Sequence, residues 1–243
     1  DSPARIVRRG ERTSALRRTA DDDDPVERVV VANATQLAIV TATADPEPST
    51  GLIDRALVAA YDADIEPVLV VTKTDLVPAD RLAALYGPSG VPLFDVHSKQ
   101  PPESLRLALH GEITVVLGHS GVGKSTLVNA LIPDAGRATG AVNTVTGKGR
   151  HTSTSAVALA VPGGGWIIDT PGIRSFGLAH VDADRVIGAF PELLPGTQEC
   201  PRACSHDEPD CGLDTWAQGQ PAAVAARLAS LRRLLTGRIP PSR

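Results

Sequence analysis

Short apolar runs alternate with segments of helical periodicity through the first half of the chain. The apolar runs lie at residues 26–32, 36–42, 67–73, 91–96 and 113–118, and the helical segments at 52–61, 80–86, 103–110 and 124–131. Strands that are apolar throughout belong inside a parallel sheet with helices on both faces. The pattern therefore predicts a doubly wound α/β domain built on a mostly parallel sheet.

The pattern changes twice further along the chain. Residues 136–154 form a loop rich in Gly, Thr and Asn, and residues 155–161 and 166–169 are apolar runs separated by glycines, which predicts a hairpin. From residue 182 onward the pattern is helical, and a group of Cys and His residues interrupts it. We expect three parts: a basic N-terminal segment at 1–24, the α/β domain at 25–180 and a small helical domain at 181–243.

The junction between the first two parts is acidic. Residues 21–24 are four aspartates followed by Pro25, and such a run is typical of a solvated joint.

Composition narrows the class of protein. The 243 residues are 42% hydrophobic, 21% charged and only 3% aromatic, which is ordinary for a globular chain. No run approaches the roughly 20 apolar residues that cross a bilayer, and no signal-peptide pattern opens the chain, so a cytoplasmic location without membrane association is expected. Met is absent even at position 1, and we expect that the chain has lost its natural beginning.

Charge is unevenly distributed. The formal net charge of −4 argues against nucleic-acid binding over the whole surface. Arginines nevertheless gather near both ends, at positions 5, 8, 9, 12, 17 and 18 and at positions 227, 232, 233, 238 and 243. Phosphate contacts and plain solvated surfaces explain these two clusters equally well.

The chain carries one phosphate-binding signature. Residues 118–126, GHSGVGKST, fit the pattern G-x-x-x-x-G-K-[ST] between an apolar run and a helix. Backbone amides of such a loop turn toward the β-phosphate, the lysine neutralises phosphate oxygens, and the serine hydroxyl binds Mg²⁺. A glycine-rich turn is the alternative, but the strand–loop–helix context argues against it. The expected contacts are Gly118, His119, Ser120, Gly121, Val122, Gly123, Lys124, Ser125 and Thr126.

The stretch VTKTDL at residues 71–76 resembles a guanine-reading loop. The carboxylate of Asp75 is suited to accept both the N1–H and the N2 amino group of guanine, a pair that adenine does not present. Thr72 stands where an Asn is commoner, and an exposed turn is the alternative explanation. We expect the base to be bound by Thr72, Lys73, Thr74, Asp75, Ser98 and Lys99.

Two further elements complete a GTPase set. Asp169-Thr-Pro-Gly172 matches the D-x-x-G element, in which the aspartate reaches Mg²⁺ through water and the glycine amide donates to the γ-phosphate. In the loop GRHTST at 149–154, Thr152 is the favoured Mg²⁺ ligand beside Ser125 and Asp169, with Thr154 as the rival. All of these elements end strands at one sheet edge, where open α/β folds bind ligands.

The order of these elements is unusual, because the base loop precedes the phosphate loop. We therefore expect a circularly permuted P-loop GTPase, whose pocket depends on where loops meet in space. The D-x-x-G element then leads directly into the C-terminal domain, which suggests that the nucleotide state is transmitted to that domain.

All three cysteines lie in residues 200–211. Cys200, Cys204, His206 and Cys211 form a Cys₃His set able to surround a structural, tetrahedral Zn²⁺. A disulfide would leave one thiol over, and buried cysteines without a metal are the other alternative.

Hydrolysis needs a group that orients water. Ile173 follows the D-x-x-G element where many GTPases place a Gln, so help must come from elsewhere. His151, beside Thr152, is the candidate, because a neutral imidazole accepts a hydrogen bond from water. A loop histidine without a catalytic role is the alternative.

The motifs TKTDL, GHSGVGKST, GRHTST and DTPGIRSFGL, in this order, resemble the circularly permuted small-ribosomal-subunit biogenesis GTPases, the RsgA family. The resemblance covers the chain from about residue 26 onward. It implies a GTPase that acts late in 30S assembly and is stimulated by the subunit, a monomer with GTP or GDP, Mg²⁺ and one Zn²⁺, and a preceding OB-fold of which residues 1–19 would be a remnant. It assigns catalysis to His151 and zinc to the same four side chains.

Two other functions stay open. One is a nucleotide-gated ribosome-docking module whose hydrolysis is incidental, and the other is a P-loop protein that uses ATP. In each GTPase interpretation, the helix near 222–235 with Arg227, Arg232 and Arg233 is a possible contact to rRNA.

Overall fold

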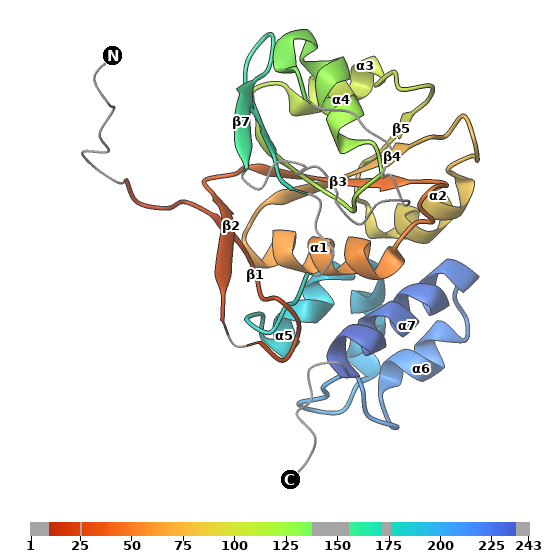
Figure 1. Cartoon of the computed structure of the whole chain (residues 1–243). Coiled ribbons are helices and arrows are strands. Elements are labelled where there is room, and N and C mark those ends of the chain that lie inside the picture. The colour runs from red at the N-terminus through yellow and green to blue at the C-terminus, as the bar shows by residue number, and fades with distance from the viewer. Residues whose placement is uncertain (1–9, 25, 138–155, 172–175, 237–243) are drawn as a thin grey trace, which may run out of the picture.

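The computed structural model describes residues 10–24, 26–137, 156–171 and 176–236 (Figure 1). Its centre is a six-stranded sheet in the order β5-β4-β3-β6-β8-β7. The strands are β3 (Gln36–Ala42), β4 (Glu66–Thr72), β5 (Leu93–Val96), β6 (Ile113–Leu117), β7 (Val157–Ala160) and β8 (Trp166–Asp169). Every pairing is parallel except that of β7 with β8. The predicted mostly parallel sheet and its terminal hairpin are confirmed.

Helices cover both faces of this sheet (Figure 1). On one face lie α1 (Thr50–Asp62) and α2 (Asp80–Tyr86), and on the other lie α3 (Glu103–Leu109) and α4 (Lys124–Leu131). All seven residues of β3 are buried. Because side chains alternate along a strand, Leu37 and Ile39 join the core under α1, whereas Ala38 and Val40 join the core under α4. The continuous apolar run in the sequence follows from this double burial.

The first apolar run, at residues 26–32, was expected in the parallel sheet, and that expectation is wrong. Its strand β2 (Arg28–Ala32) pairs antiparallel with β1 (Ala15–Arg18) in a separate two-stranded sheet. Val29 is 44% exposed, so the run is not covered on both sides. The pairing also crosses the predicted domain boundary at residue 24. The boundaries and the OB-fold remnant remain predictions.

The acidic joint is more firmly held than its composition suggests. Asp22 accepts two hydrogen bonds from the Arg55 guanidinium, at 2.6 and 2.5 Å, and one from the Leu178 amide, at 3.0 Å. Thr19 and Gly177 exchange backbone hydrogen bonds of 3.0 and 3.1 Å. At Gly177 a Cβ would lie 2.2 Å from the Asp21 carbonyl oxygen, so only glycine fits. The joint therefore fastens the N-terminal hairpin to the segment that follows the D-x-x-G element.

The C-terminal region packs below α1 and α2 in Figure 1. It consists of α5 (Ala183–Val186), α6 (Gly212–Ala217), α7 (Ala222–Thr236) and the 3₁₀ turns η3 (Ile187–Ala189) and η4 (Pro191–Glu199). Short 3₁₀ turns also follow α2 and α4, as η1 (Gly87–Ser89) and η2 (Pro133–Ala135). The apolar residues of the C-terminal region belong to the same core cluster as those of α1 and α2. The region is thus continuous with the core of the α/β domain.

One arginine of α7 lies in this interface. Arg227 is fully buried, pairs with Asp54 of α1 and Glu192 of η4, and packs between the rings of Tyr86 and Phe190. An arginine without exposed surface is not available to bind rRNA, so this part of the sequence-based expectation is wrong. Arg232 pairs with Asp214 at 2.7 Å.

Candidate nucleotide-binding site

The phosphate loop joins β6 to α4 at the carboxyl edge of the sheet. Two glycines explain why the chain can make this turn. A Cβ on Gly118 would lie 2.2 Å from the Val40 carbonyl oxygen, and Gly123 has a φ of +94°, in the region that favours glycine. Gly123 directly precedes α4, so the first amides of that helix face the loop. The backbone here has the shape that an anion requires.

Lys124 is held inside this loop. Its ammonium group donates to the carbonyl oxygens of Gly118 and His119, each at 2.7 Å, and the residue is only 8% exposed. Burial lowers the pKa of Lys124 to about 8, and the nearby Asp169 carboxylate opposes that change. Burial, and then the Lys124 charge, lower the pKa of His119. Asp169 is the anion that acts on Lys124, and the ammonium group is held by the loop carbonyls at the position where a phosphate would bind.

Thr72 links the base loop to the phosphate loop. It ends β4 and is buried, and its hydroxyl lies 2.6 Å from the Val122 carbonyl oxygen and 3.1 Å from that of Thr41. The hydroxyl donates to the first of these. Thr72, which stands where an Asn is commoner, thus connects the base loop to the phosphate loop.

The base loop and the loop after β5 contact each other. The Ser98 amide donates to the Asp75 carboxylate at 3.1 Å, and Lys73 donates to the Asp45 carbonyl oxygen. Lys73, Ser98 and Lys99 have φ angles of +59°, +47° and +64°. Such conformations are strained for residues other than glycine and gather at functional sites. Thr74 follows Lys73 in the turn after β4 and is half-buried.

Asp169 ends β8, next to the phosphate loop. Its side chain is 5% exposed, and the guanidinium of Arg137 binds it, with Nε at 2.8 Å and Nη2 at 2.7 Å from Oδ2. Ser125 is in the first turn of α4, which contacts β8. Gly172, His151, Thr152 and Thr154 lie outside the described residues, so their predicted roles stay predictions.

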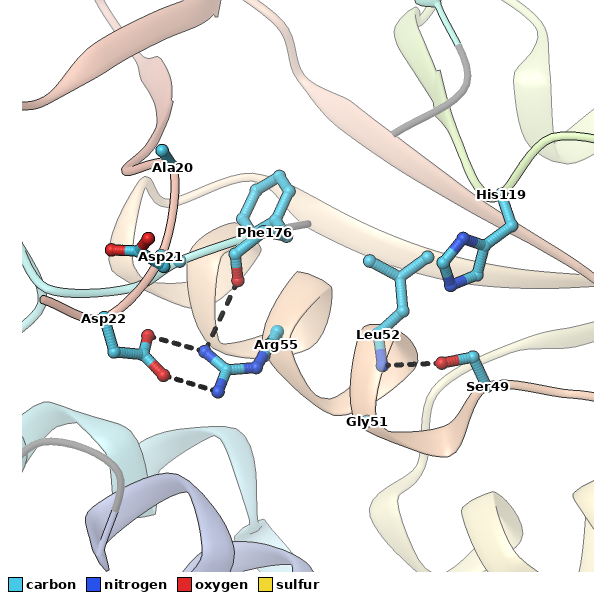
Figure 2. A pocket seen from close by; sticks show the side chains of 10 residues that line it. Ala20, Asp21, Asp22, Ser49, Gly51, Leu52, Arg55, His119 and Phe176 are labelled. Carbon is cyan, nitrogen blue, oxygen red and sulfur yellow. Dashed lines mark hydrogen bonds and ion pairs between the residues drawn. The ribbon is translucent and has the colours of Figure 1, made fainter. Parts of the chain in front are cut away.

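A cavity of about 320 Å³ lies beside His119 of the phosphate loop (Figure 2). It lies between the acidic joint, the start of α1 and Phe176, and Figure 2 shows Arg55 reaching both Asp22 and the Phe176 carbonyl oxygen. Sequence patterns did not reveal Arg55, Asp22 or Arg137, because each acts through a partner far along the chain.

The four predicted metal ligands come together in the C-terminal region. The ligand atoms of Cys200, Cys204, His206 and Cys211 all lie within 4.8 Å of one another. Cys200 Sγ is 3.6 Å from His206 Nδ1 and 3.8 Å from Cys211 Sγ. His206 has a φ of +66°, which turns the backbone between the two outer cysteines. The arrangement is a possible metal-binding site.

A P-loop with a buried lysine, a carboxylate-bearing base loop and a D-x-x-G aspartate at one sheet edge define a circularly permuted GTPase fold. The family model described as RsgA GTPase matches residues 9–179. The chain belongs to the RsgA GTPase family, as its motifs predicted.

Individual relatives agree with this assignment. The chain is 44% identical to the small ribosomal subunit biogenesis GTPase RsgA of Ectopseudomonas mendocina, over 85% of this chain and 62% of that protein. It is 43% identical to the protein of that name from Azotobacter vinelandii, with the same coverage. The chain thus spans about 62% of the length of these curated relatives.

Two solved structures resemble the fold. The structure of YjeQ from Thermotoga maritima has a TM-score of 0.71 and 27% identity, covering 94% of this chain and 76% of that one. The structure of YloQ, a circularly permuted GTPase, has a TM-score of 0.67 at 24% identity, covering 96% and 75%. In the part of the chain that the structure describes, no helix is both long and apolar enough to cross a membrane.

Proposed function

We propose that this chain binds and hydrolyses GTP in the late assembly of the small ribosomal subunit, and that the subunit stimulates its turnover. The observation that carries GTP binding is the joining of the two loops. Thr72 binds the phosphate loop at Val122 while Asp75, three residues later, is aligned by the Ser98 amide. A carboxylate on a loop that contacts the phosphate loop in space is suited to accept the paired N–H groups of a guanine base. The partner and the cytoplasmic location are proposed from the family, as is a monomeric state.

Specificity for guanine is tested at Asp75. The variant Asp75→Asn replaces a two-oxygen acceptor with one acceptor and one donor, so affinity for GDP should fall at least about a hundredfold, the effect of losing two charge-assisted hydrogen bonds. Affinity for xanthosine diphosphate should rise, because xanthine offers an oxygen where guanine has its amino group. Asp95→Asn, on β5, is the matched control. ATP binding as tight as GTP binding by the original chain would refute the assignment.

The residues at the phosphate end fit a magnesium nucleotide. The Ser125 hydroxyl and the Asp169 carboxylate are hard oxygen donors of the kind that Mg²⁺ prefers, and they lie on adjoining elements, α4 and β8. A bound Mg²⁺ would neutralise charge on the β- and γ-phosphates. Lys124 would bind the same oxygens. Thr152, or Thr154, is proposed as the further hydroxyl ligand.

His151 is proposed to orient the attacking water, since Ile173 has no polar group for that purpose. The variant His151→Ala should leave GDP affinity unchanged and lower the turnover number measured with 30S subunits about a hundredfold or more. A turnover number equal to that of the original chain would remove His151 from the mechanism. If 30S subunits change only affinity and leave turnover unchanged, the chain is a docking module instead.

The Cys₃His cluster is proposed to hold one structural Zn²⁺. In a tetrahedron with metal–sulfur bonds of about 2.3 Å and metal–nitrogen bonds of about 2.0 Å, sulfur atoms are about 3.8 Å apart and sulfur is about 3.5 Å from nitrogen. The distances of 3.8 Å between Cys200 and Cys211 and 3.6 Å between Cys200 and His206 match these values. Four protein ligands leave no open position for catalysis.

A further inference from the structure

Arg137 is an unexpected partner for the carboxylate of the D-x-x-G element. Two of its nitrogens, Nε and Nη2, lie 2.8 and 2.7 Å from the same oxygen of Asp169. Both side chains are withdrawn from solvent, at 16% and 5% exposure. An ion pair this enclosed is weakly screened, and its hydrogen bonds are of the stronger, charge-assisted kind.

Lys124 is not the cation that hydrogen-bonds to Asp169. Its ammonium donates to two carbonyl oxygens of the phosphate loop, Gly118 and His119. The Asp169 carboxylate acts on Lys124 through charge, without a hydrogen bond between the two among the described contacts. The cation that binds the carboxylate directly is therefore the arginine. Because a guanidinium does not lose its proton in proteins, this positive charge can leave Asp169 only if the side chain moves.

The backbone of Arg137 is fixed separately from its side chain. The Asn129 side chain of α4 accepts a hydrogen bond from the Arg137 amide at 2.9 Å and donates one to the Arg137 carbonyl oxygen at 2.8 Å. Gly136, with a φ of +59°, turns the chain after η2 into this position. The guanidinium thus reaches Asp169 from a residue whose backbone is anchored to α4 independently of the ion pair.

We propose that Arg137 is a positioning residue that competes with Mg²⁺ for Asp169, so that the cation is bound only when it displaces the guanidinium. This rests on the proposed function, in which Asp169 reaches Mg²⁺ through water. The arginine N–H groups occupy lone pairs of Oδ2 that the hydrogen atoms of such a water would also use. Two cations held at one carboxylate repel each other, so the stability of the ion pair lowers the affinity of the site for Mg²⁺.

The test measures how much free Mg²⁺ the full chain needs to retain mant-GDP. Nucleotide release is followed by fluorescence while EDTA buffers set the free Mg²⁺ concentration. The midpoint is the free Mg²⁺ concentration at which the release rate lies halfway between its values without Mg²⁺ and at saturating Mg²⁺. For Arg137→Ala the midpoint should be about tenfold lower than for the original chain, which corresponds to about 1.4 kcal/mol. Arg137→Gln, with a side chain of similar length and no charge, should show a shift in the same direction.

Arg106→Ala is the matched control. Arg106 also binds the end of α4, through the Ala130 carbonyl oxygen at 2.8 Å, but lies on α3 and has no described contact with Asp169. Its midpoint should equal that of the original chain. A residue that only braced the fold would leave the midpoint unchanged or raise it when removed, and either result in both Arg137 variants overturns the inference. An original chain that retains no mant-GDP at any Mg²⁺ concentration overturns the proposed function, and the inference with it.

Discussion

Arg227 provides the sharpest test of how the C-terminal region is attached. Its guanidinium donates through Nε to Glu192 at 2.6 Å, through Nη1 to Asp54, and through Nη2 to the Ala189 carbonyl oxygen at 3.2 Å. The Tyr86 and Phe190 rings lie 5.0 and 4.2 Å from its central carbon. The variant Arg227→Met keeps much of the packing volume and removes the charge and all three donors.

The expected loss of stability follows from the two buried carboxylates that the substitution leaves without their arginine. Asp54 and Glu192 are almost fully buried, with side chains 2% and 4% exposed, and the second oxygen of Glu192 has no partner among the described residues. Removing one partner of a buried ion pair costs about 3–5 kcal/mol, because an uncompensated charge remains. Stabilities of whole domains are about 5–15 kcal/mol, so the loss is a large share of the total.

Urea unfolding measures this loss. Two tryptophans are available, and in a Trp166→Phe background the fluorescence of Trp216, on α6, reports on the C-terminal region alone. Arg233→Met, an exposed position on the same helix, is the control and should change the free energy of unfolding by less than about 0.5 kcal/mol. Adding Asp54→Asn and Glu192→Gln to Arg227→Met should restore part of the stability. The reasoning is refuted if Arg227→Met alone costs no more than the control.

Three further outcomes can be checked. Because burial places the pKa of Lys124 near 8 and the charged form binds phosphate, GDP affinity should fall about tenfold from pH 7 to pH 9, measured by calorimetry, and Lys124→Arg should abolish that dependence. Zinc release with a mercurial and a metal-sensitive dye should yield one ion per chain, and a chelator should lower the temperature at which Trp216 fluorescence changes; no bound zinc would contradict the proposed site. Arg55→Ala should speed hydrogen exchange of the Leu178 amide about tenfold, while Arg106→Ala should leave it unchanged.

The sequence predicted the sheet, its helices and the convergence of the nucleotide loops because these depend on local signals. In a run such as residues 36–42 every residue except Gln36 and Thr41 is apolar, and this pattern indicates burial on both faces. The glycines at 118 and 123 and the carboxylate at 75 follow strands, the carboxylate at 169 ends one, and parallel strands bring such ends to one edge. The four metal-ligand residues lie within twelve positions of one another.

Long-range ion pairs could not be predicted in this way. Arg227 and Asp54 are 173 positions apart, and Arg55 and Asp22 are 33 apart, so no local periodicity relates them. An arginine on a helix such as α7 is expected to be exposed to solvent unless a buried partner is known. The strand at 28–32 was misplaced for a related reason, since an apolar run reports a tendency to form a strand but not the strand with which it pairs.

The order of the strands governs how the sheet grows as the chain leaves the ribosome. β3, which lies between β4 and β6, is synthesised before either. β4 and β5 then extend the sheet on one side of β3. About seventy more residues must be synthesised after β3 before β6, which begins at Ile113, can pair with its other side. During that interval a mostly apolar strand presents an unpaired edge, the kind of surface from which misassembly starts. The edge of β3 that faces β6 therefore needs protection in the nascent protein until residue 113 and the strand that begins there have been made.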